Sequence, residues 1–179
     1  RLKLMKNDGS DAVDPTEYRS IVGSLRYLVN TRPDICYAVG LVSRYMEAPT
    51  ALHMAAVRHI LRYVSGTVTY GCRYERHGSS RPRVVGYSDS DFAGDPDDRK
   101  STTGTVFFFG SSCVLWASQK QKTVALSSCE AEYIAAAMAA CHGVWLGRLA
   151  GELQGKAPME AKLLVDNKSA IALCKNPIH

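Results

Sequence analysis

The sequence contains no CxxC pair and no Cys/His cluster, although it has six cysteines and five histidines. Without closely spaced thiolates and imidazoles, a zinc site is not expected. The cysteines are far apart and mostly lie in apolar runs, which favours buried, reduced thiols over a disulfide framework. They are Cys36, Cys72, Cys113, Cys129, Cys141 and Cys174. This pattern predicts an intracellular protein.

Signals for membrane insertion or secretion are also missing. No stretch reads as long and apolar enough to cross a bilayer, and the start, RLKLMKNDGSD, is polar where a signal peptide would be apolar. We therefore expect no membrane partner. The first residue is Arg rather than Met, which indicates a piece of a longer protein.

A Ser or Cys nucleophile is not indicated either, because the histidines follow no motif that would link them to one. His53 and His59 are predicted to be surface or packing residues. A chain of 179 residues with 46% hydrophobic content can bury a core, as one domain with an appendage or as two small domains. The net charge of +5 slightly favours an anionic partner.

Residues 1–13 are predicted to be a linker, followed by a helical unit over residues 14–66. In the first helix, Asp14 is the expected N-cap, Pro15 the first helical residue and Glu17 the partner that completes a capping box. Apolar residues then recur at helical spacing and predict one buried face. They are Tyr18, Ile21, Val22, Leu25, Leu28 and Val29.

Two further helices are predicted within this unit. In residues 31–46, Thr31 and Asp34 can cap each other, and in residues 50–66 the helix ends at Gly66, which suits a left-handed C-cap. The apolar faces are predicted from the 3.6-residue period. They consist of Ile35, Ala38, Val39 and Val42 in one helix and Met54, Val57, Leu61 and Val64 in the other.

The hydrophobic pattern changes after residue 66. Residues 67–179 are predicted to form an α/β domain with a mixed sheet. Strands are expected over 68–74 and 81–89, and a clearer hairpin over 102–110 and 112–118. A long helix rich in Ala and Glu starts at Ser128 and ends before Gly155 and Pro158. A short strand over 161–166 and a final helix over 167–176 complete the predicted order β β β β α β α.

Three carboxylates in this half have settings that suit a divalent cation. Asp89 ends a predicted strand, and Asp166 ends another in the same manner. A third acid comes from the start of the long helix, where Glu130 and Glu132 point about 200° apart. Glu132 shares its face with small residues and is the one predicted to face the sheet. Such a cluster repels itself unless a cation neutralises it, so Mg²⁺ binding is the expected outcome.

Simpler explanations compete with this one. The acidic loop DSDFAGDPDDRK can be read as a solvated turn. It is not an EF-hand, because Ala93 and Lys100 occupy positions that require oxygen ligands. Asp166 can also be read as a helix N-cap.

Three strings together resemble the ribonuclease H domain of copia-type retrotransposon polyproteins: GYSDSDFAGDPDDRKSTTGTVFFFG, WASQKQKTVALSSCEAEYIAAA and VDNKSAIAL. The upstream string YRSIVGSLRYLVNTRPDICYAVGLVSRYM resembles the helical thumb region that precedes ribonuclease H in the same family. The resemblance covers nearly the whole chain. It implies a ribonuclease H-like fold after residue 66, and a polyprotein containing reverse transcriptase as partner.

By resemblance, Asp89, Glu132 and Asp166 match the family's metal-ligating and catalytic acids, which selects Glu132 over Glu130. In that family four acids hold two Mg²⁺ ions, for which Mn²⁺ can substitute, and the enzyme cuts the RNA strand of RNA/DNA hybrids. The resemblance places the fourth acid on a helix beyond residue 179, after a further strand, so low hydrolytic activity is expected from this stretch alone. A cytoplasmic, virus-like-particle or nuclear location would follow.

Hybrid recognition is expected to depend on shape and on contacts to 2′-hydroxyls and phosphates. Ser127 and Ser128 at the start of the acidic helix, and Lys168 beside Asp166, are the candidates near the acids. Arg99 and Lys100 are candidate phosphate ligands. The alternatives are a catalytically impaired or domesticated module that binds nucleic acid or a protein partner, and a connector that functions only beside the polymerase.

Overall fold

The computed structural model describes residues 3–75 and 82–176, and the chain divides into two compact units, residues 1–72 and 73–179. The division lies six residues after the expected boundary at residue 66. Part of the predicted loop after residue 74 lies outside the described residues. Each unit has its own hydrophobic core.

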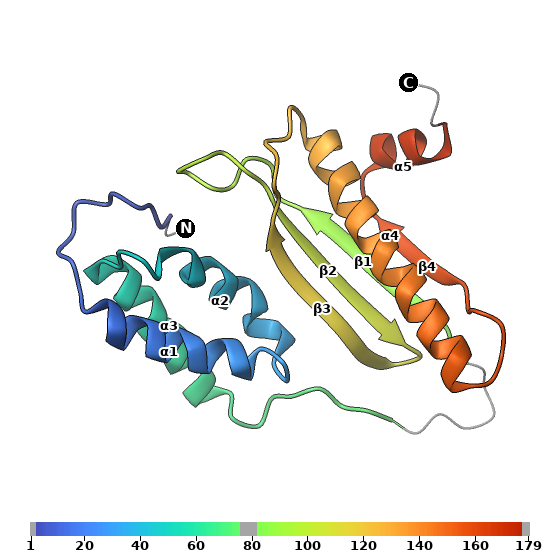
Figure 1. The fold of residues 1–179 in the computed structure, drawn as a ribbon, viewed down its shortest axis with the longest axis horizontal. Coiled ribbons are helices and arrows are strands. Elements are labelled where there is room, and N and C mark those ends of the chain that lie inside the picture. Colours follow the sequence, from blue (N-terminus) through green and yellow to red (C-terminus); the bar gives the residue numbers. More distant parts are fainter. Residues whose placement is uncertain (1–2, 76–81, 177–179) are drawn as a thin grey trace. The chain divides into compact units, whose positions relative to one another are not determined.

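The first unit is helical, as the sequence predicts (Figure 1). Its buried positions on the first and second helices match the expected apolar faces, since Tyr18, Val22 and Val39 are buried. On the third helix Ile60 is buried, whereas Leu61, predicted to be inside, is 39% exposed. The helices are α1 (Pro15–Leu28), α2 (Cys36–Val42) and α3 (Ala51–Gly66), with short 3₁₀ turns at Pro33–Ile35 and Ser43–Tyr45.

The helix caps match the expected ones only at the start of α1. Asp14 does cap α1, by accepting from the N–H of Thr16. The capping box forms at α3 instead, between Thr50 and His53. Asp34 forms an ion pair with Arg32 at 2.7 Å rather than a cap with Thr31. Gly66 ends α3 without a left-handed backbone, because the positive-φ glycines within the described residues are at other positions.

Residues 3–13, expected to be a linker, pack onto the helical unit. Leu4 belongs to its core, and the hydroxyl of Tyr45 donates to the Leu4 carbonyl at 2.8 Å. His53, a packing residue as predicted, is buried and stacks on the Tyr45 ring at 4.0 Å. The N–H of Val13 bonds to the carbonyl of residue 49 at 3.1 Å. The segment is therefore part of the folded unit.

The second unit is a mixed α/β domain with a four-stranded sheet in the order β3-β2-β1-β4. The β1 strand pairs antiparallel with β2 and parallel with β4, and β2 pairs antiparallel with β3. Its elements are β1 (Val84–Ser90), β2 (Thr102–Phe109), β3 (Ser112–Lys120), α4 (Ser128–Leu153), β4 (Ala161–Val165) and α5 (Lys168–Lys175).

The strand expected over residues 68–74 does not form. Its proposed partner, β1, has β2 on one edge and β4 on the other, so neither edge is open to another strand. Gly71 also lowers the strand propensity of the segment. The observed order in this unit is therefore β β β α β α.

Helix α4 packs along β1 and β4 (Figure 1), with Phe107, Ala139 and Leu146 in the shared core. Close approach depends on small residues. A Cβ at Gly86 would lie 2.2 Å from the Phe107 ring, so the strand has glycine where the ring crosses it. At the far end of α4, Gly147 lies against the connection to β4, and its carbonyl accepts from the N–H of Met159 at 2.9 Å.

The expectation that no stretch could span a bilayer is wrong for α4. By length and composition its 26 residues, Ser128–Leu153, are apolar enough to cross a membrane. One face of the helix packs on the sheet and carries the buried acid Glu132. A helix that packs on the core of a folded domain passes the same test of length and composition. Helix α4 packs on β1 and β4 in this way.

We expect Gly147→Ala to destabilise the second unit by about 1–3 kcal/mol, because overpacking costs this much. The new Cβ would lie 2.2 Å from the Met159 carbonyl oxygen, a backbone atom that cannot rotate away. Gly104→Ala is the control, since its Cβ would meet nothing closer than 4.0 Å. Urea unfolding followed by tryptophan fluorescence measures this unit alone, because Trp116 and Trp145 both belong to it. Equal midpoints for the two variants would contradict the packing argument.

Candidate metal centre

Three acids from separate elements meet at one end of the second unit's sheet. Asp89 lies near the end of β1, Asp166 directly follows β4, and Glu132 is in the first turns of α4. Because β1 and β4 are parallel neighbours, their carboxyl ends lie side by side. One carboxylate oxygen from each acid lies within 4.8 Å of the others. The convergence expected from the sequence is therefore present.

Glu132 is the acid with the most constrained surroundings. The residue is 6% exposed, whereas Asp89 and Asp166 are exposed. Its Oε1 accepts from the N–H of Ser90 at 3.1 Å, and the same N–H donates to Asp89 Oδ1 at 2.9 Å. Its Oε2 is buried and has no hydrogen-bond partner within the described part of the chain. Burial raises the pKa of Glu132, and the nearby charges of Asp89 and Asp166 raise it further.

The donor set fits a hard divalent cation such as Mg²⁺ or Mn²⁺. All three ligands are carboxylate oxygens, and the unpartnered Oε2 of Glu132 is a buried acceptor that a cation would satisfy. Three carboxylates this close repel one another in the absence of positive charge. Asp89, Glu132 and Asp166 are the residues that could hold the ion.

The choice between the two helix acids is as predicted. Glu130 points away from the cluster, where its Oε2 accepts from the N–H of Leu126 at 2.7 Å. Its own N–H donates to the Ser127 hydroxyl, the N-cap of α4, at 3.1 Å. Glu132 instead lies on the buried face of the helix with Ala135 and its neighbours. Glu130 therefore stabilises the start of the helix.

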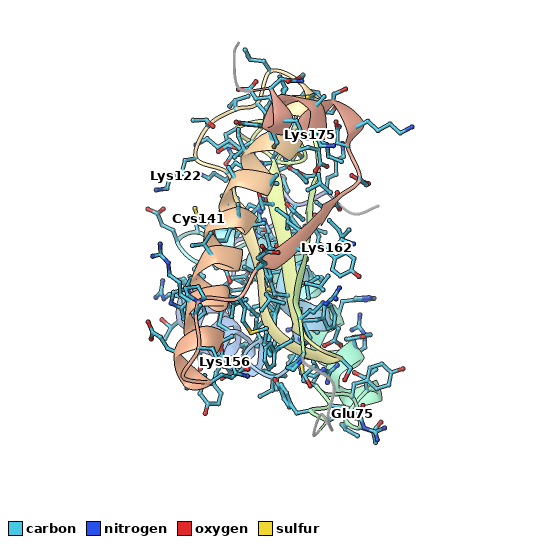
Figure 2. The ribbon with its side chains drawn as sticks, turned by 90° about the vertical axis from the view of Figure 1, so that its right-hand side faces the viewer. Glu75, Lys122, Cys141, Lys156, Lys162 and Lys175 are labelled. Carbon is cyan, nitrogen blue, oxygen red and sulfur yellow. The ribbon has the colours of Figure 1, made fainter. Side chains whose placement is uncertain are left out.

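The predicted nucleic-acid contacts fall into two places. Ser127 and Ser128 are exposed at the start of α4, and Lys168 is the exposed first residue of α5. Figures 1 and 2 show α5 near the end of α4 that carries these serines. Arg99 is exposed in the loop after β1, and Lys100 lies 3.9 Å from Asp98. Lys168 is thus the candidate closest in sequence to a cluster acid.

Asp166 is not an N-cap, although that was one reading of its position before a helix. The cap of α5 is Asn167, whose Oδ1 accepts from the N–H of Ala170 at 2.9 Å. The carboxylate of Asp166 remains oriented toward the other two acids.

The loop after β1 is more ordered than the solvated turn considered from sequence. Asp95 is buried, bonds to Lys120 Nζ at 2.6 Å and accepts from the N–H groups of Asp97 and Asp98. Burial alone would raise the pKa of Asp95, but the Lys120 ammonium and the two N–H groups outweigh it and lower the pKa to about 2. Sequence reasoning missed this pair because Lys120 comes from β3, some 25 residues later.

None of the six cysteines forms a disulfide, as expected. The expectation that they are buried is wrong, because four are half-buried and Cys141 and Cys174 are exposed.

The fold and the cluster define the second unit as an α/β domain with a candidate divalent-metal centre. Known proteins extend this description. The Pol polyprotein of transposon RE1 from Arabidopsis thaliana is 43% identical over 176 residues, which are 98% of this chain and 12% of that polyprotein. The Pol polyprotein of transposon TNT 1-94 from Nicotiana tabacum is 48% identical over 163 residues, 90% of the chain and 12% of the polyprotein.

A third relative is short. Secreted RxLR effector protein 161 of Plasmopara viticola is 47% identical over 130 residues, which are 72% of this chain and 90% of that protein. No family model matches the chain, and no solved structure matches it either. The chain belongs to the family of Pol polyproteins from copia-type retrotransposons, and it spans about one eighth of the length of the polyproteins it matches.

We expect Asp95→Asn to lower the unfolding free energy of the second unit by about 2 kcal/mol at pH 7, since each pKa unit is worth about 1.4 kcal/mol. Asp95 has a lowered pKa, about 2 instead of 3.8, so its contribution is present above pH 3.8 and is lost as the pH falls through 2. The difference between the two proteins should therefore shrink below pH 4. Urea unfolding by tryptophan fluorescence at a series of pH values measures it. Asp97→Asn, at an exposed position, is the control.

Proposed function

We propose that the second unit is the ribonuclease H domain of a copia-type retroelement polyprotein. It would hydrolyse the RNA strand of RNA/DNA hybrids during reverse transcription, with Mg²⁺ or Mn²⁺ as cofactor. The observation that supports this most directly is the convergence of Asp89, Glu132 and Asp166 within 4.8 Å. Membership of the Pol polyprotein family supports the retroelement context.

The fold proposal is a ribonuclease H-like domain preceded by a thumb-like helical unit. Its support is the mixed sheet in the order β3-β2-β1-β4, with α4 on one face and the acids at the ends of the parallel strands. The helical unit, residues 1–72, has its own core, and the three acids of the cluster belong to the second unit.

The chain's own residues would act as follows. When bound, the divalent cation would activate water and neutralise charge at the scissile phosphate. Asp89 and Asp166 would hold it from the strand ends, and Glu132 from the buried side. The N–H of Ser90 keeps Glu132 Oε1 oriented, so that Oε2 is the oxygen available to the ion.

Hybrid binding would use the polar groups at the same end of the sheet. The hydroxyls of Ser127 and Ser128 suit 2′-hydroxyl contacts across a minor groove, and Lys168 suits a phosphate. Arg99 and Lys100 would add phosphate contacts from the loop after β1. The partners would be the hybrid and the rest of the polyprotein, within a cell or a virus-like particle.

We expect this chain to cleave the labelled RNA strand of a hybrid with Mn²⁺. Asp89→Asn should reduce the rate by at least about 100-fold, because ligands matter more than outer-shell groups, whose loss costs about 10–100-fold. Asp97→Asn, an exposed acid of the following loop, should leave the rate unchanged. Calorimetric titration with Mn²⁺ measures the metal affinity of both variants without requiring turnover.

Cleavage that persists in Asp89→Asn would disprove the assigned site. Hybrid binding without cleavage at any Mn²⁺ concentration would favour a module that binds nucleic acid without cutting it. A chain that binds neither the hybrid nor Mn²⁺ would contradict the proposal and favour a connector role.

Lys168→Ala should weaken binding to hybrids of every base sequence by a similar factor. It should also reduce the magnitude of the slope of log affinity against log salt concentration by about one, as expected for one lost phosphate contact. Lys175→Ala on the same helix is the matched control, because Lys175 is exposed in the last turn of α5 (Figure 2). Fluorescence anisotropy over a salt series measures both. Equal slopes for the two variants would remove Lys168 from the interface.

A further inference from the structure

A buried amide connects the two elements that carry Asp89 and Glu132. Gln121 follows β3 and is 2% exposed. Its Nε2 lies 3.2 Å from the Ser90 hydroxyl, 3.1 Å from the Thr103 hydroxyl and 3.0 Å from the Ala131 carbonyl. Ser90 directly follows Asp89 in β1, and Ala131 directly precedes Glu132 in α4. One side chain therefore contacts the neighbours of two cluster acids.

The orientation of this amide follows from its partners. The Ala131 carbonyl can only accept a hydrogen bond, so the atom facing it must be the N–H group of Gln121. A rotated amide would bring two oxygens together there. The Ser90 hydroxyl donates its own hydrogen to the Asp91 carbonyl at 2.9 Å, which leaves it as an acceptor for Gln121. All three contacts are made by Nε2, which has two hydrogens, so one hydrogen is shared between two of the oxygens. The other end of the amide, Oε1, is buried and has no hydrogen-bond partner among the described residues.

Gln121 and the residue before it also make contacts that fix their position. Its own N–H donates to the Ser101 carbonyl at 2.8 Å. The preceding residue, Lys120, bonds to the buried Asp95 and to Asp98, both in the loop after β1. The amide therefore sits on a fixed point of the sheet, from which it can set the position of α4 relative to β1.

We propose that Gln121 is a positioning residue of the metal centre: it sets the separation of Asp89 and Glu132 by bonding to Ser90 and Ala131. This inference depends on the function proposed above. The two carboxylates repel each other, and the contact between Ser90 N–H and Glu132 Oε1 is a second bond that links β1 to the start of α4. Without the amide, the acids can move apart, and a cation would meet a poorer geometry.

The test compares Gln121→Met with Thr103→Val. Methionine keeps the volume of the side chain but cannot donate to Ala131, so it removes the link between β1 and α4. Valine at position 103 removes one acceptor within the sheet and leaves that link intact. Ser90→Ala is a milder second variant, because it removes only the contact with β1. Tryptophan fluorescence confirms that each variant is folded under the assay conditions.

For Gln121→Met we expect Mn²⁺ affinity or kcat to fall by about 10–100-fold, the usual effect of losing an outer-shell group. The KM for the hybrid should stay the same, because Gln121 is buried and does not reach the substrate. Ser90→Ala should shift in the same direction by less, and Thr103→Val should stay near the wild type. A structural role alone would lower stability without changing the Mn²⁺ dependence.

The wild type separates the two proposals. If it binds Mn²⁺ and cleaves the hybrid while Gln121→Met and Ser90→Ala behave like it, the positioning role is wrong and the proposed function stands. If the wild type binds Mn²⁺ without cleaving, the calorimetric affinities of the variants decide the positioning role alone. If the wild type binds no Mn²⁺, both proposals fail.

Discussion

Like-charge repulsion between three carboxylates is the constraint on which the second unit depends. Asp89, Glu132 and Asp166 have oxygens within 4.8 Å of one another, and one of the acids is buried. Such a cluster is unfavourable by itself, so other interactions must hold it together. Parallel pairing of β1 with β4 fixes two of the acids, and packing of α4 on the sheet fixes the third. The small residues of α4 serve this purpose, because they let the helix approach the strands closely.

The end of β3 supplies the polar contacts that complete this arrangement. Lys120 and Gln121 are consecutive, yet they bond in different directions. Lys120 neutralises the buried Asp95 and so orders the loop that follows Asp89. Gln121 reaches the start of α4. Within that loop Ala93 and Arg99 have positive φ, a conformation that costs about 1–2 kcal/mol per residue and persists only where other contacts determine it. The ion pair with Lys120 is one such contact.

How much the sequence could predict depended on the range of the interaction. The three acids could be found because each has a local signal, a strand end or a helix start. Helical period places Glu130 and Glu132 on different faces, the small residues beside Glu132 favour it as the inward one, and the family resemblance selects it. The strand predicted over residues 68–74 does not form, and the reason is not local. Both edges of β1 are occupied by other strands, which the β propensity of residues 68–74 cannot indicate. Gln121 could not be found either, because its partners come from β1, β2 and α4. Its polarity in a sequence looks like that of any surface glutamine.

The candidate metal centre lies in the second of the two units. The three acids of the cluster, and the hydrogen bonds that Ser90 and Gln121 make beside them, belong to the second unit. The helical unit orders its own N-terminal segment through His53 and Tyr45, and its core shares no residue with the sheet domain. Yet the match to the RE1 polyprotein covers 98% of the chain, so the two units occur together there. The elements that bring the three acids together, β1, β4 and α4, all belong to the sheet domain, so the geometry of the cluster follows from the pairing and packing within that unit.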